Sequence, residues 1–197
     1  MKETTVEKAK IGAACGRFQI FHNDHLKYVL AAKKECDYLL VGITSADPSA
    51  SPKEKADPNR GKSTSNPCTY FERMEMVRDS LLEAGLSREE FDIIPFPIGR
   101  PELLAFYIPD ETRCLITIYD EWGENKKQRL EDLGYEVGVL WHVTPETKGI
   151  SASTIRARIA SGEAWAEMVP PAVYRYITAH EIDKRIARLI SEEAQVR

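Results

Sequence analysis

An α/β fold, with a five-stranded parallel sheet and a helical C-terminal segment, is predicted by three features of the sequence. The first is a set of five short apolar runs of strand length, at residues 11–15, 38–43, 91–94, 114–118 and 136–140. The second is that helical patterns separate these runs, and the third is that the pattern after residue 151 is helical to the end. Short apolar strands that alternate with helices pair in parallel and are covered on both faces, so we expect a Rossmann-like, doubly wound sheet.

The connecting helices are expected at residues 25–34, 69–84, 102–108 and 124–133. Thr69 and Glu72 have the spacing of a capping box, which marks the start of the second of these helices. Gly85 and Gly134 follow two of the helices at the position where a glycine typically ends one. The last helix, at residues 182–194, alternates charged and apolar positions, and it could dock on the core, mediate dimerisation or remain a frayed tail.

Length and composition describe a globular chain that is long enough to bury a core. The 197 residues, 43% hydrophobic and 29% charged, fit one domain that spans 1–197. The net charge of -4 gives no overall positive field, so we expect no nucleic-acid partner. No apolar run approaches the roughly 18 residues that span a bilayer, so no membrane partner is expected either. The four cysteines form no C-x-x-C pair, which indicates reduced thiols in a cytoplasmic protein.

Residues 47–67 differ from the rest of the chain because they are rich in Pro, Ser, Lys and Asp. This stretch is too long and too polar for an ordinary connection, so we expect either a mobile lid over the active site or a flexible insertion. It contains Gly61-Lys62-Ser63-Thr64, which suggests a P-loop. That motif requires a glycine at position 56, where the sequence has Ala56, and a strand just before it, so a P-loop kinase is not expected.

A first phosphate-binding pattern lies where the first strand ends, in the run Gly16-Arg17-Phe18-Gln19-Ile20-Phe21-His22-Asn23-Asp24-His25. In a parallel sheet this strand-to-helix turn is the usual seat of a phosphate, and the helix N-terminus offers unpaired N–H groups. His22 and His25 straddle the turn, and both could direct ring N–H donors at one phosphate group. A zinc site would require a third or fourth ligand, which no cysteine or histidine cluster supplies, so we expect no metal site built by the protein.

A second phosphate-binding pattern follows the fifth strand, where the run Gly149-Ile150-Ser151-Ala152-Ser153-Thr154-Ile155-Arg156 opens a helix. Ser151, Ser153 and Thr154 bring three hydroxyl groups to one helix N-terminus. Arg156 lies one turn into the helix and can make forked hydrogen bonds to phosphate oxygens. Ordinary N-capping explains one of these serines, but it does not explain three hydroxyl groups together with an arginine.

The two patterns together, G-R-F-Q-x-F-H-x-x-H and I-S-A-S-T-I-R, resemble the nucleotidyltransferase superfamily that is marked by H-x-G-H and I-S-S-T-x-I-R. Within it, the chain resembles the archaeal-type nicotinamide-nucleotide adenylyltransferases. Further matches lie at Asn66-Pro67-Cys68-Thr69-Tyr70-Phe71-Glu72-Arg73 and at Ser161-Gly162-Glu163-Ala164-Trp165. The resemblance spans residues 11–177. It implies transfer of a nucleoside monophosphate from a nucleoside triphosphate to the phosphate of a small acceptor, with release of pyrophosphate.

The resemblance also implies roles for individual residues. The nucleotide would be bound by Gly16, Arg17, Phe18 and Gln19 of the first pattern and by Ile150, Ser151, Ser153 and Thr154 of the second. His22, His25 and Arg156 would be the catalytic residues, which stabilise the charge that develops on the phosphates. Mg²⁺ would bridge phosphate oxygens and rely mainly on substrate and water ligands. The attacking phosphate oxygen is already anionic near neutral pH, so no general base is expected.

Two departures from the family pattern bear on the substrates. Asp24 replaces the family's glycine, and its side chain must point away from the phosphates or help to hold a cation. The segment between residues 95 and 140 lacks the family's nicotinamide-pocket pattern. Contacts to the acceptor are therefore expected from Arg17, Arg100, Tyr119 and Trp122, although each aromatic side chain could equally be packed in the core.

The identity of the base and of the acceptor stays open at this point. We favour transfer of AMP, to an acceptor such as nicotinamide mononucleotide, because the second pattern and its extension resemble the nicotinamide enzymes so well. One alternative is a cytidylyltransferase that acts on a small alcohol phosphate or phosphonate. Another, from a different class, is a nucleotide-binding sensor without chemistry. Assembly into a homo-oligomer is compatible with the resemblance, since relatives commonly assemble.

Overall fold

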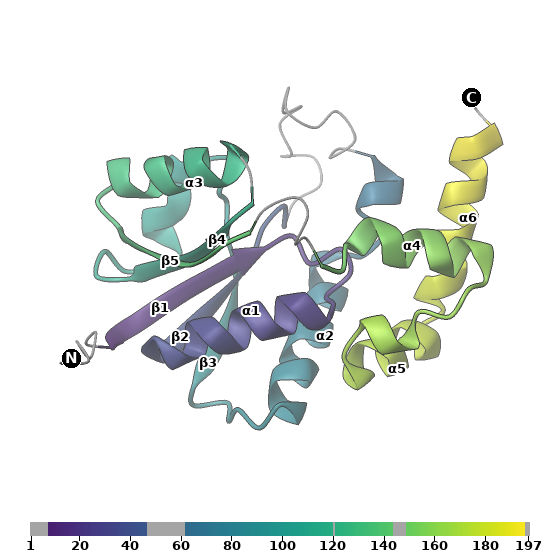
Figure 1. The fold of residues 1–197 in the computed structure, drawn as a ribbon, viewed down its shortest axis with the longest axis horizontal. Helices are drawn as coiled ribbons and strands as arrows, with labels where there is room; N and C mark the ends of the chain where they lie inside the picture. Colours follow the sequence, from purple (N-terminus) through teal and green to yellow (C-terminus); the bar gives the residue numbers. More distant parts are fainter. Residues whose placement is uncertain (1–7, 47–61, 120, 144–148, 196–197) are drawn as a thin grey trace.

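A computed structural model describes residues 8–46, 62–119, 121–143 and 149–195. It contains five strands, β1 (Ala9–Gly16), β2 (Cys36–Ile43), β3 (Phe91–Pro95), β4 (Arg113–Ile118) and β5 (Glu136–His142). They pair in parallel in the order β3-β2-β1-β4-β5, as Figure 1 shows. All five predicted strands are present, and the predicted fold class is confirmed.

Helices cover both faces of the sheet and enclose two separate apolar clusters. On one face, α1 (Asn23–Lys34) and α2 (Tyr70–Glu83) pack on side chains such as Leu39 and Val41. On the other face, the 3₁₀ helix η3 (Pro101–Phe106) and α3 (Glu121–Asp132) pack on Leu40 and its neighbours. Successive residues of β2 thus belong to different clusters, because side chains alternate between the faces of a strand. Both faces are covered, which explains why the strands read as continuous apolar runs.

The C-terminal segment gathers beyond the carboxyl ends of the strands (Figure 1). It consists of α4 (Ala152–Ser161), the short 3₁₀ helix η5 (Ala166–Met168), α5 (Pro171–Ala179) and α6 (Ile182–Gln195). Helix α6 buries Ile182 and Ile186 and packs on α4 and α5. Of the three expectations for this helix, docking on the core is therefore observed, and assembly of the chain into an oligomer remains a prediction.

Two expectations about local structure require correction. The α-helix expected at residues 102–108 is a 3₁₀ helix of six residues that begins at Pro101 and ends at Phe106, a length typical of the short pieces in which 3₁₀ helices occur. The predicted helix at residues 124–133 begins earlier, at Glu121. The lid or insertion expected at residues 47–67 lies mostly outside the described residues, which resume at Lys62 with the 3₁₀ helix η2 (Ser63–Ser65). Among the described helices, none combines the length and the apolar character needed to cross a membrane.

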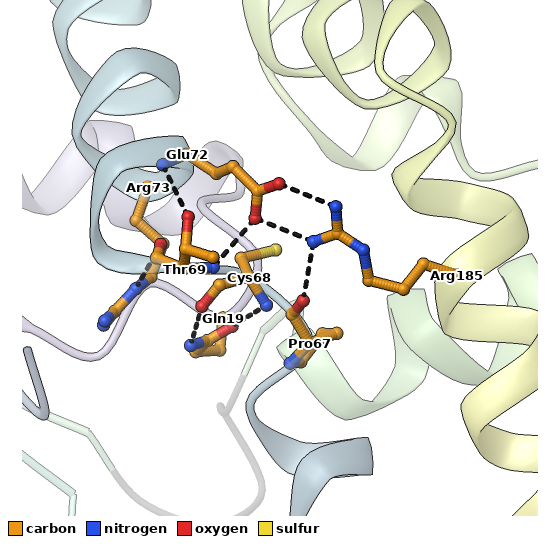
Figure 2. Close-up of polar contacts among 7 residues, drawn as sticks. All are labelled: Gln19, Pro67, Cys68, Thr69, Glu72, Arg73 and Arg185. Atoms are coloured by element: carbon orange, nitrogen blue, oxygen red, sulfur yellow. Dashed lines mark hydrogen bonds and ion pairs between the residues drawn. The ribbon is translucent and has the colours of Figure 1, made fainter. Parts of the chain in front are cut away.

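A polar connection ties α6 to the start of α2. Figure 2 shows the guanidinium of Arg185 donating two hydrogen bonds, each 2.8 Å long, to the carboxylate of Glu72, and a third of 3.1 Å to the carbonyl of Pro67. The same carboxylate accepts the backbone N–H of Thr69 at 2.8 Å and completes the predicted capping box. Arg185 therefore stabilises both the docking of α6 and the N-terminus of α2.

We predict that Arg185→Ala lowers the free energy of unfolding by about 2 kcal/mol, because hydrogen bonds to charged groups contribute about 1.5–3 kcal/mol. Urea unfolding followed by circular dichroism measures the change. Arg188→Ala is the matched control, since Arg188 pairs with Glu192 at a mostly exposed position where an ion pair contributes little. Equal stability losses in the two variants would contradict a special role for Arg185.

Candidate active site

A cavity of about 330 Å³ opens at the carboxyl ends of β1 and β4. These two strands are neighbours in the sheet, and the connections that leave them cover opposite faces, which makes this the topological switch point where ligands bind in open α/β sheets. Three segments build the wall of the cavity. They are the turn from β1 into α1, the connection from the end of β4 into α3, and the loop at the start of α4. They contribute Cys15, Gly16, Arg17, Phe18, Gln19, His22, Asp24, His25, Tyr28, Thr117, Tyr119, Trp122, Gly123, Lys126, Gly149, Ile150, Ser151 and Ala152.

The two histidines of the first turn form the N-terminal cap of α1. Nδ1 of His22 accepts the backbone N–H of His25 at 3.4 Å, and Nδ1 of His25 accepts the backbone N–H of His22 at 3.3 Å. The rings stack with their centroids 3.5 Å apart. Because both Nδ1 atoms are acceptors, each neutral ring carries its proton on Nε2. The cap therefore fixes the tautomer in which His22 offers an Nε2–H donor.

Burial keeps both imidazoles neutral near pH 7. It lowers the pKa of His22 from 6.5 to about 4, although the nearby Asp24 carboxylate opposes this shift. The pKa of His25 lies well below its ordinary value, mainly because the ring is desolvated and because His22 and Arg17 lie close by; a hydrogen bond to the backbone of Ile20 acts in the opposite direction. The site therefore presents the neutral Nε2–H donor of His22 beside the permanent charge of Arg17.

Two buried arginines hold the backbone of the turn from behind. Arg73 on α2 is 1% exposed and donates to the carbonyls of Arg17, Thr44 and Ser45 at 2.8–2.9 Å. Arg156 on α4 is also buried and donates to the carbonyl of Gln19. Burial lowers the pKa of each guanidinium to about 10, so both remain charged at neutral pH. These bonds fix the loop that carries Arg17 and precedes His22.

The Gln19 side chain adds a further connection to this loop (Figure 2). Its Nε2 donates to the carbonyl of Cys68 at 2.8 Å, and its Oε1 accepts the backbone N–H of Cys68 at 2.9 Å. The amide thus pairs with one residue in the manner of a neighbouring strand. Gly16 is required for packing, because a Cβ there would overlap the ring of Phe18.

The second loop brings the N-terminus of α4 to the cavity. Ser151 is the N-cap, and its Oγ accepts the backbone N–H of Thr154 at 3.1 Å. The same hydroxyl lies 2.9 Å from Oγ of Ser153 and 2.8 Å from Oγ1 of Thr154. The positive end of the α4 dipole and the hydroxyl of Ser151 therefore face a site suited to an anion.

Asp24 connects the two loops directly. Its Oδ2 accepts the backbone N–H of Ile150 at 2.6 Å, across 126 positions of sequence. A Cβ at Gly149 would overlap the same carboxylate, so the glycine allows this close approach. The sequence left two expectations for Asp24, to point away from the phosphates or to help hold a cation. In the structure its side chain joins the segment before α4 to the start of α1.

The third wall comes from the end of β4 and the start of α3. Thr117, Tyr119, Trp122 and Lys126 lie there, with the ammonium of Lys126 5.9 Å from the centre of the Trp122 ring. Lys126 was not among the residues that the sequence singled out, because it lies in a charged run. Its spacing of four from both Trp122 and Leu130 places it on the inward face of the helix, and this was the available signal.

The structure brings together most of the residues that the sequence singled out. Within the described chain, the cavity wall includes His22, His25, Arg17, Gly16, Phe18, Gln19, Ile150, Ser151, Tyr119 and Trp122. Ser153, Thr154 and Arg156 lie on α4 outside that wall, and Arg100 pairs with Glu102 on the surface. Among the described residues, no three His, Cys, Asp or Glu side chains gather in a way that could hold a metal ion.

The chain is similar in sequence to two kinds of nucleotidyltransferase. A phosphonoformate cytidylyltransferase from Streptomyces viridochromogenes is 45% identical over 90% of this chain and 96% of its own length. A nicotinamide-nucleotide adenylyltransferase from Thermococcus kodakarensis is 32% identical over 91% of this chain and 88% of its own.

The fold matches a solved bifunctional NMN adenylyltransferase/ADP ribose pyrophosphatase from Francisella tularensis, in complex with AMP and a manganese ion. The TM-score is 0.71 at 15% identity, and the match covers 95% of this chain but 54% of that protein. These relationships define the class: the chain is a nucleotidyltransferase. A cytidylyltransferase-like family model matches residues 13–158, so the chain belongs to that family.

The pKa of His22 makes stability dependent on pH. The unfolded chain takes up a proton at this residue below about pH 6.5, whereas the folded chain does so only below about pH 4. The free energy of unfolding should therefore fall as the pH is lowered through this window, by up to about 3 kcal/mol from this group. Urea unfolding at several pH values measures the slope.

His22→Asn is expected to flatten this slope, because asparagine keeps an N-cap acceptor and does not titrate. His180→Asn, which changes an exposed histidine at the end of α5, is the matched control. An unchanged slope in His22→Asn would show that another group causes the acid sensitivity.

For Asp24 we predict that Asp24→Ala abolishes hydrogen-exchange protection of the Ile150 amide, because its acceptor is removed. Asp24→Asn keeps a side-chain oxygen and should retain much of the protection. The alanine variant should also lose about 1.5–3 kcal/mol of stability, the contribution of a hydrogen bond to a charged group. Full protection of Ile150 in Asp24→Ala would contradict this connection.

Proposed function

We propose that this protein transfers CMP from CTP to the phosphonate oxygen of a small phosphonate and releases pyrophosphate. The observation that carries the choice of base and acceptor is the 45% identity with the Streptomyces phosphonoformate cytidylyltransferase, over 96% of that enzyme. The identity with the adenylyltransferases is lower, at 32% for the Thermococcus enzyme. The sequence expectation favoured AMP, and the family includes both activities, so the proposal concerns substrate choice within a shared chemistry.

The triphosphate is proposed to lie between the two loops that Asp24 joins. Arg17 supplies a permanent positive charge, and the Nε2–H of His22 supplies a neutral donor. Ser151 and the N-terminus of α4 supply hydroxyl and backbone donors from the opposite loop. Donors from both loops thus converge on one cavity, as binding of a polyanion requires.

The reaction is an in-line displacement at the α-phosphorus. An anionic oxygen of the acceptor forms the new P–O bond, and the bond to the β-phosphate breaks, with its electron pair leaving on pyrophosphate. The acceptor oxygen already carries charge near neutral pH, so these residues need only position the reactants and stabilise the developing charge. His22 suits this role because burial keeps its ring a neutral, preorganised donor, while His25 supports it through the mutual cap and directs its own N–H to the backbone of Ile20.

Arg156 has a positioning role in this proposal. Its guanidinium binds the carbonyl of Gln19, so it fixes the first loop rather than reaching the cavity wall. Bound Mg²⁺ would neutralise charge on the phosphates. Asp24 is the one carboxylate on the wall among the described residues, and it already binds Ile150, so the ion is expected to rely on phosphate and water ligands.

The test is pyrophosphate release from CTP or ATP with phosphonoformate or nicotinamide mononucleotide as the acceptor. We expect CTP with phosphonoformate to give the highest kcat/KM. His22→Asn should lower kcat by about 10²–10³, the cost of losing one preorganised donor, while the asparagine keeps α1 capped. Faster turnover of ATP with nicotinamide mononucleotide would replace this proposal with adenylyl transfer, and wild-type turnover of His22→Asn would remove His22 from the mechanism.

A further inference from the structure

Lys126 is the buried cation on the wall formed by α3. The residue is 8% exposed and lies more than one turn into the helix, on the face that also carries Trp122. It lines the cavity together with Thr117 at the end of β4. A lysine is rarely buried to this extent unless a partner compensates for the lost hydration.

Within the part of the chain that the structure describes, the Lys126 ammonium has no hydrogen bond or ion pair, and it lies over the Trp122 ring. The next residue behaves differently, since the ammonium of Lys127 lies 2.9 Å from the Glu131 carboxylate. Oγ1 of Thr117 is also buried without a hydrogen-bond partner in the described residues. One wall of the cavity thus holds a lysine without a hydrogen bond or ion pair in the described chain, together with a buried hydroxyl that has no partner there.

Both groups can donate hydrogen bonds, and one is cationic, so their natural ligand is an anion with acceptor oxygens. In the proposed function, the loop after β1 and the N-terminus of α4 already bind the triphosphate. Lys126 and Thr117 come from a different pair of elements, β4 and α3. They are therefore suited to a second acidic group in the same cavity.

We propose that Lys126 and Thr117 bind a carboxylate of the acceptor, separate from the phosphonate group that attacks CTP. This inference rests on the proposed function and narrows its substrate class to phosphonates that carry a carboxylate. The carboxylate would orient the acceptor so that its phosphonate oxygen faces the α-phosphorus. An acceptor without a carboxylate would leave Lys126 buried and unpaired, which is a strong basis for discrimination.

Binding is tested by calorimetry in the presence of CMP, which occupies the nucleotide site without reacting. The probes are phosphonoformate and methylphosphonate, which differ in the carboxylate. We expect wild-type protein to bind phosphonoformate about 100-fold more tightly, and Lys126→Gln to remove this preference. Lys127→Gln is the matched control and should keep the preference, and Thr117→Val should reduce it by roughly tenfold.

Kinetics with CTP and phosphonoformate provide the second readout. Lys126→Gln should raise the KM for phosphonoformate by about 100-fold and leave the KM for CTP unchanged. Wild-type binding of phosphonoformate by Lys126→Gln, no preference for phosphonoformate in the wild type, or a raised KM for CTP would overturn the inference. A preference that depends on Lys126 without pyrophosphate release from CTP would instead refute the proposed function and leave this subsite standing.

Discussion

Two buried guanidinium groups fix the loop on which the site depends. Arg73 reaches it from α2 and Arg156 from α4, and both bind backbone carbonyls of residues 17–19. A buried charge is stabilising only when it is hydrogen-bonded, and these arginines satisfy that requirement with loop carbonyls. The loop is consequently held by helices that are far apart in sequence. Its position relative to β1 is set by the packing of the whole domain rather than by the loop itself.

The fixed loop determines the chemistry of the two histidines. Their mutual cap uses both Nδ1 atoms and places the protons on Nε2, and their burial keeps the rings neutral. A neutral donor does not require a counter-ion, whereas two adjacent imidazolium groups with centroids 3.5 Å apart would repel each other. Permanent positive charge on the wall of the same cavity comes from Arg17 and Lys126.

The cavity is assembled from loops that belong to different parts of the chain, and Asp24 joins two of them. Its hydrogen bond to the Ile150 amide places a carboxylate in the cavity that is proposed to bind a polyanion, where uncompensated negative charge would be unfavourable. The Asp24 carboxylate accepts a hydrogen bond of 2.6 Å from the Ile150 N–H. Its negative charge also opposes the lowering of the His22 pKa. Gly149 makes the contact sterically feasible, so the two residues act as a unit.

The sequence by itself determined the sheet, because five apolar runs and their helical connections leave few other arrangements. It also determined where the two turns with predicted anion-binding residues lie, since His22, His25 and Ser151 occupy strand ends and helix starts that any parallel sheet brings to one edge. Local patterns did not identify the histidine cap, because imidazoles seldom occupy an N-cap. They also predicted that Arg156 binds the phosphates; in the structure its guanidinium binds the carbonyl of Gln19, and the phosphate contact stays a prediction.

Only the tertiary structure decided which groups share a wall. Lys126 and Thr117 line the same cavity as the histidines, at the switch point between β1 and β4. Asp24 forms a hydrogen bond with Ile150, which lies 126 positions away in the sequence. No local period or motif encodes such distances, because they depend on how helices on opposite faces of the sheet are packed. The sequence therefore fixes which elements form and which ends carry polar side chains, while packing decides which of those side chains become neighbours.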